Sequence, residues 1–133
     1  MADTVSTRIL EQGERNLIVQ LTNLSDGTGE TGVVKVDAST LSPIPDDLVI
    51  DWVQWDISGM NVQIDWDATA NVTALLLGAG QGVQDYRIFG GVSNNAGAGK
   101  TGDMLVTTIG AASNASYNIT LGLRKKYDGP VVS

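Results

Sequence analysis

Apolar and polar residues alternate with a period of two along much of this chain. Between residues 60 and 66, Val62, Ile64 and Trp66 fall on one side of an extended backbone and polar residues fall on the other. Residues 117–124 repeat the pattern, with an apolar residue at every second position. Such alternation predicts antiparallel strands that have one face against a core and the other in water.

Other short segments follow the same pattern and bring the expected number of strands to about nine. Loops rich in Gly, Asn, Asp and Ser separate them, chiefly at 25–29, 41–47 and 90–102. The further strands are expected at 5–10, 15–24, 33–36, 48–57, 72–77, 86–89 and 104–109. We therefore predict an all-β fold over residues 1–133, a single-domain antiparallel β-sandwich that is jelly-roll-like and has about eight to nine strands.

The chain contains no Cys and no His, which excludes several classes of site. Disulfide scaffolds, thiolate zinc sites and cysteine nucleophiles need Cys. Ser-His-Asp catalysis and His-ligated metals need His. No cofactor is expected. No apolar run approaches the roughly 20 residues that cross a bilayer, and the polar start lacks the features of a signal peptide. We therefore expect a protein made in the cytosol of its host cell, with no membrane partner.

Charge is unevenly distributed along the sequence. Eight Lys and Arg against fifteen Asp and Glu give a net charge of −7, which argues against a nucleic-acid partner because phosphates attract a basic surface. No basic residue lies between Lys35 and Arg87, an interval that holds eight Asp residues. Basic side chains gather instead at Arg124, Lys125 and Lys126. This asymmetry indicates either a solvated sheet face or complementarity between copies or with a larger partner.

Two segments resemble catalytic or phosphate-binding motifs without their context. Residues 94–101, NNAGAGKT, end like a P-loop, but the motif needs Gly in place of Asn94 and a helix afterwards, whereas a strand pattern follows here. Lys100-Thr101-Gly102 matches the KTG element of penicillin-recognising enzymes, yet no Ser-x-x-Lys accompanies it. Both matches are interpreted as a hairpin loop.

Acidic residues offer two further candidates. Asp65 and Asp67 flank Trp66, an arrangement that suits a glycosidase cleft if one carboxyl has a raised pKa, and equally suits an exposed strand face that ends in a turn. Residues 26–30, DGTGE, could hold Ca²⁺ through oxygen ligands, although they match no complete EF-hand loop. We assign no catalytic residue and no metal ligand from these patterns.

The tryptophans are the main candidates for recognition. Trp52 and Trp55 are three residues apart on an expected strand, so they point to opposite faces. At least one then fills the core, while another is available for an interface or a sugar platform. The interface candidates come from the middle strands and the basic end, and they are Trp55, Trp66, Asp65, Asp67, Arg124, Lys125 and Lys126.

Four segments follow one another in order over residues 14–127. They are ERNLIVQLTNLSDGTGETGVVKVDASTLSP (14–43), VIDWVQWDISGMNVQIDWDAT (49–69), YRIFGGVSNNAGAGKTGDMLVTT (86–108) and YNITLGLRKKY (117–127). In this order the chain resembles small virion structural proteins encoded by tailed bacteriophages. The resemblance carries no catalytic motif and implies a β-sandwich or jelly-roll subunit that acts by assembly.

The resemblance also implies a role and partners. The expected role is a non-enzymatic capsid decoration or cement protein of the virion, bound to the major capsid protein and to copies of itself as a trimer or other homo-oligomer. A head–tail connector or tail component is the neighbouring possibility. Residues 1–12 and 127–133 are candidates for extended arms on a neighbouring subunit. The alternative from a different class is a carbohydrate-binding, lectin-like sandwich, because exposed Trp beside Asp and Asn is typical of sugar recognition.

Overall fold

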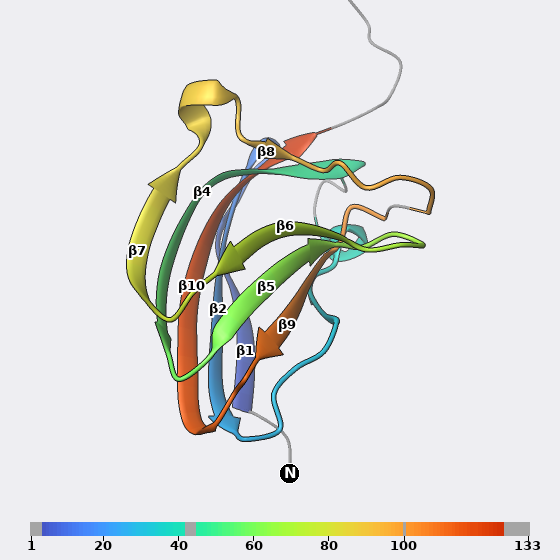
Figure 1. Ribbon diagram of the computed structural model, residues 1–133. Coiled ribbons are helices and arrows are strands. Elements are labelled where there is room, and N and C mark those ends of the chain that lie inside the picture. The colour runs from blue at the N-terminus through green and yellow to red at the C-terminus, as the bar shows by residue number, and fades with distance from the viewer. Residues whose placement is uncertain (1–3, 42–44, 100, 127–133) are drawn as a thin grey trace, which may run out of the picture.

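The computed structural model describes residues 4–41, 45–99 and 101–126. This part of the chain forms ten strands and two short 3₁₀ helices (Figure 1), and it contains no helix long and apolar enough to cross a membrane. The strands are β1 Thr4–Gln12, β2 Asn16–Asp26, β3 Val33–Val36, β4 Asp47–Ser58, β5 Asn61–Trp66, β6 Val72–Leu77, β7 Gly80–Asp85, β8 Val92–Ser93, β9 Met104–Ile109 and β10 Ser113–Lys126. The 3₁₀ helices are η1 Ala38–Thr40 and η2 Arg87–Phe89.

The strands form two antiparallel sheets that face each other (Figure 1). The larger sheet has the order β1-β2-β10-β4-β7, with the short β8 beside β4, and the smaller sheet has the order β3-β9-β5-β6. Without β1 and β8, the chain crosses between two four-stranded sheets at almost every connection. This is the arrangement of a jelly roll, in which two Greek keys close over one core. The predicted all-β sandwich is confirmed.

The core lies between the sheets and follows the predicted alternation. Leu17, Val19 and Leu21 of β2 are at most 1% exposed, and Ile64 and Trp66 of β5 in the opposite sheet are fully buried. Each such side chain contributes about 1.5–3 kcal/mol by leaving water. We call the surface of each sheet that faces this core its inner face, and the opposite surface its outer face.

The central strand of the larger sheet is β10. Its pairing with β2 runs from Ser113 to Arg124, and its pairing with β4 runs from Ser116 to Lys126. β4 contains a bulge, because Leu123 pairs with Ile50 while Gly122 pairs with Trp52. The extra residue, Asp51, lets Ile50 and Val53 both face the core although they are three positions apart.

The expected arms are only partly described. Residues 4–12 form β1, which pairs with β2 from Thr4 to Gln12, so this part of the expected arm is an edge strand of the larger sheet. Residues 127–133 lie outside the described residues.

The prediction of a strand at 86–89 is wrong. Residues 87–89 form η2, because the side chain of Asp85 accepts the Arg87 backbone N–H at 2.9 Å and Gly90 closes the turn at a left-handed φ of 87°. The longer strand that pairs with β4 at this edge is β7, whose six residues, GQGVQD, have no hydrophobic alternation.

Two tryptophans of β4 lie over glycines in neighbouring strands, and they point to opposite faces as predicted. Trp55 packs against the core, and a Cβ atom at Gly82 of β7 would lie 2.5 Å from its Cζ2 atom. Trp52 lies on the outer face above Gly122 of β10, with which it is paired. The glycines therefore give each indole ring room to lie flat against the sheet.

Replacing Gly122→Ala tests this packing. A methyl group at this position would collide with the indole of Trp52, so we expect the free energy of unfolding to fall by about 1–3 kcal/mol. Urea denaturation followed by circular dichroism measures the change. Gly97→Ala is the matched control, because no atom lies within 4 Å of the added Cβ. Equal stability of the two variants would show that Trp52 moves without cost.

Candidate functional site

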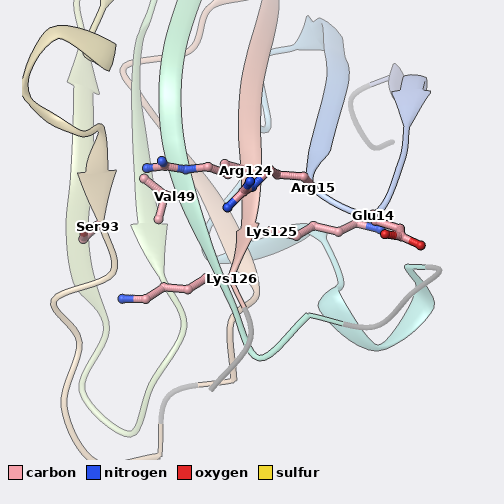
Figure 2. A pocket seen from close by; sticks show the side chains of 7 residues that line it. All are labelled: Glu14, Arg15, Val49, Ser93, Arg124, Lys125 and Lys126. Atoms are coloured by element: carbon pink, nitrogen blue, oxygen red, sulfur yellow. The ribbon is translucent and has the colours of Figure 1, made fainter. Parts of the chain in front are cut away.

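A surface depression at one end of the larger sheet is lined mainly by basic residues (Figure 2). It has a volume of about 580 Å³ and lies where the β1–β2 turn, the start of β4, β8 and the end of β10 meet. These segments come together because Arg124 of β10 pairs with Asn16 of β2 on one side and Val49 of β4 on the other. We call this depression the basic hollow; its lining residues are Glu14, Arg15, Val49, Ser93, Arg124, Lys125 and Lys126.

Arg124 is held in place by two contacts. Its guanidinium donates to the Gly90 carbonyl at 2.7 Å and lies 3.6 Å from Oδ1 of Asp51, the extra residue of the β4 bulge. Asp51 and Gly90 thus fix the side chain on the outer face. This partial neutralisation leaves Arg124 as an anchored donor rather than a free charge.

Lys125 behaves differently from its two neighbours, because successive side chains of a strand point to opposite faces. Lys125 is only 4% exposed, and its ammonium group donates to Oε1 of Gln12 at 3.2 Å. Burial lowers the pKa of this ammonium group. In Figure 2 its side chain runs toward Glu14 and away from Arg124 and Lys126.

Arg15 and Lys126 supply the available positive charge. Both side chains are exposed, and among the described residues neither forms an ion pair with an acidic side chain. Their backbones are engaged: the Lys126 carbonyl accepts a hydrogen bond from the Asp46 N–H at 2.9 Å, and the Arg15 carbonyl accepts one from the Lys125 N–H at 2.6 Å. The basic hollow therefore presents two unneutralised cations beside the anchored Arg124, a combination that attracts carboxylate groups of a partner. Arg15 was not a predicted site residue, because it is more than one hundred positions from Lys126 in the sequence.

The acidic residues of the middle strands do not form one surface. Asp56 is exposed on β4, whereas Asp47 and Asp65 are buried. The Asp65 carboxylate accepts a hydrogen bond from Nε2 of Gln63 at 2.9 Å, and the Asp67 carboxylate accepts one from the hydroxyl of Thr101 at 2.8 Å.

Asp67 belongs to a group of nearby carboxylates with Asp37 and Asp103. Burial raises the pKa of Asp103, and the negative charges of Asp37 and Asp67 raise it further. Oδ1 of Asp103 accepts the Ala38 N–H at 2.8 Å, which keeps its side chain turned into the fold. Within residues 4–41, 45–99 and 101–126, no set of three or more acidic side chains has the geometry to hold a metal ion.

Trp66 is not part of any surface, and its selection as an interface candidate is wrong. It is fully buried at the end of β5, where it fills the core between the two sheets. Asp65 and Asp67 consequently do not flank an exposed ring. Trp55 is half-buried and borders a second depression of about 430 Å³, lined also by Gln54, Asp56, Gln81, Gly82, Val83, Asn118 and Thr120.

The possible calcium loop at 26–30 is also used otherwise. Its last residue, Glu30, is buried and forms an ion pair of 2.5 Å with Lys35 of β3. The same carboxylate accepts Nδ2 of Asn23 at 2.7 Å and the hydroxyl of Tyr117 at 2.6 Å. This buried polar network joins β2 and β10 of one sheet to β3 of the other. Local sequence patterns do not predict it, because Tyr117 is 87 positions from Glu30.

Comparison with known proteins adds no relative: no family model, no curated protein and no solved structure matches this chain.

The buried polar network predicts a strong effect of Lys35→Met. This substitution leaves the Glu30 carboxylate buried without its cation, so we expect the free energy of unfolding to fall by about 3–5 kcal/mol. Adding Glu30→Gln removes the stranded charge and keeps an acceptor for Tyr117, so the double variant is expected to be more stable than Lys35→Met alone. Urea titration of both variants at neutral pH measures the difference. A double variant no more stable than the single one would contradict the charge-pair interpretation.

Proposed function

We propose that this protein is a non-enzymatic structural subunit of a tailed-phage particle that decorates or cements the capsid shell, with the major capsid protein and copies of itself as partners. The observation that carries the proposal is the basic hollow. In a chain with a net charge of −7, it concentrates Arg15, Arg124 and Lys126 at one end of the larger sheet. Such a surface steers and orients an acidic partner.

Two further features support the proposal. The jelly roll is a fold of viral capsid proteins, although lectins and cupins share it, so fold alone does not decide between these roles. The resemblance of residues 14–127 to virion structural proteins favours the role in a capsid. A single weak electrostatic contact is sufficient for a decoration subunit, because an oligomer repeats the contact and raises the avidity.

Neutralising the basic hollow tests the particle contact. The double variant Arg15→Gln and Lys126→Gln removes both available cations and leaves Arg124 and the buried Lys125 in place. We expect at least about tenfold weaker binding to capsid shells of the parent phage that lack the protein, since even about 1.4 kcal/mol changes a dissociation constant tenfold. Occupancy is measured by co-sedimentation at low and moderate salt, and wild-type binding should weaken as salt screens the charges.

The matched control is Asn61→Asp with Gln84→Glu. It changes the net charge by the same amount at exposed positions of β5 and β7, and neither residue lines either depression. Unchanged occupancy of the neutralised variant would overturn the proposed contact. Copy number per particle then separates the placements: hundreds of copies indicate the shell, whereas about six or twelve indicate a connector or tail ring.

The second candidate function is carbohydrate binding, and the depression beside Trp55 favours it. This depression is lined by the amide and carboxylate side chains of Gln54, Asp56, Gln81 and Asn118 together with the half-buried Trp55, and such polar groups suit the hydroxyls of a sugar.

A glycan array tests this candidate. A hit that is lost in Trp55→Ala would support a lectin-like role, whereas an array without hits would remove it. Trp66→Ala is unsuitable here, because Trp66 is a core residue and its loss reports on folding.

A further inference from the structure

The first strand leaves one edge of the larger sheet open. β1 pairs with β2 along one side, and within the described residues no strand pairs with its other side. All nine residues of β1 are exposed. An edge of this length presents unpaired backbone N–H and C=O groups to solvent and is a template for another strand.

Apolar side chains lie along this open edge. Val5, Ile9 and Leu10 are between 44% and 49% exposed. Val5 and Ile9 pair with the inward-facing residues Asn23 and Val19 of β2, so they continue the inner face of the larger sheet beyond the covered core. A partner strand alongside β1 would cover Ile9 and Leu10 while extending the sheet.

A bulge brings two opposite charges of β1 onto one face. Ile9 pairs with Val19 and Glu11 with Ile18, so Leu10 is an extra residue. In a regular strand, residues three positions apart point to opposite faces. The extra residue reverses this relation and places Arg8 and Glu11 together on the outer face.

Both charges are available to a partner. Arg8 and Glu11 are exposed, and within the described part of the chain neither forms a hydrogen bond or an ion pair with another side chain. β1 therefore offers one cation and one anion on the same face, on either side of the half-exposed Ile9 and Leu10.

We propose that the occupant of this edge is a second copy of the chain, paired antiparallel along β1 about a two-fold axis between Ile9 and Leu10. Arg8 of each copy then lies opposite Glu11 of the partner subunit, and the two-fold axis makes this ion pair twice. Thr7 lies opposite Gln12 of the partner subunit on the other face, so the two faces stay in register. The larger sheets of the two copies become one continuous sheet.

Two other symmetric registers are less favourable. A pairing centred on Arg8 places two guanidinium groups opposite each other, and a pairing centred on Glu11 does the same with two carboxylates; like charges directly opposite destabilise a sheet. The charge-matched register requires two residues three positions apart to share a face, and the bulge at Leu10 supplies this condition. The bulge at Leu10 thus favours both a second copy of the chain as the partner and the register that pairs Arg8 with Glu11.

This inference goes beyond the proposed contact of the basic hollow with an acidic surface. The residues of the two surfaces are different, and pairing through β1 is a property of the isolated chain. Its test uses purified protein without particles, so failure of the dimer leaves the particle contact standing, and the reverse also holds.

Sedimentation equilibrium of the full chain at low salt measures the dimer, and charge reversal of β1 identifies the contact. Arg8→Glu and Glu11→Arg each place two pairs of like charges across the two-fold axis, so each is expected to weaken the dimer at least about tenfold. The charge-swapped double variant, Arg8→Glu with Glu11→Arg, is expected to restore it. An equimolar mixture of the two single variants is expected to form a heterodimer, because opposite charges then face each other.

Circular dichroism and thermal unfolding control for folding, and all four proteins are expected to match because these side chains lie outside the core. A wild-type chain that stays monomeric at all concentrations would overturn the proposal. So would a dimer or larger oligomer that single reversal leaves unchanged, since its contact would lie elsewhere. Failure of the double variant and of the mixture to restore pairing would refute the Arg8–Glu11 register.

Discussion

The structure depends on the pairing of β10 with two strands at once. By hydrogen bonding to β2 on one side and to β4 on the other, β10 joins the beginning and the middle of the chain into one sheet. The inward-facing Ile119 and Leu121 are fully buried, and Tyr117 reaches the carboxylate of Glu30 between the sheets. The end of the same strand carries the basic residues. Core, interior polar network and candidate contact surface therefore all depend on this strand's register.

Irregularities in the sheet determine where charged groups appear. In β4, the bulge at Asp51 keeps Ile50 and Val53 in the core and provides the carboxylate that lies 3.6 Å from Arg124. In β1, the bulge at Leu10 brings Arg8 and Glu11 onto one face. Both local departures from ideal pairing preserve the apolar alternation elsewhere in the strand and change the chemistry of the outer face.

Much of the fold was predictable, because a strand with one covered face repeats its apolar residues every two positions. That rule identified β5 and β10 and failed at β7, where Gly82 is needed to accommodate Trp55 rather than to supply an apolar side chain. The site was less predictable. Because side chains alternate along β10, Lys125 is buried and Lys126 is exposed. Arg15, from the turn before β2, lies in the same hollow as Lys126. Only the pairing of distant strands reveals such neighbours.

The central position of β10 also has a consequence for how the protein is made. β10 is the last described strand of the chain, yet β2 and β4 have no common neighbour without it. During synthesis on a ribosome, the larger sheet cannot close until this late segment has emerged, so earlier strands wait with open edges. Folds dominated by such distant pairings form slowly and are exposed to aggregation in the interval. Residues 37–85 hold eight Asp and no basic residue, so the segment is net negative, and net charge of one sign opposes association between chains.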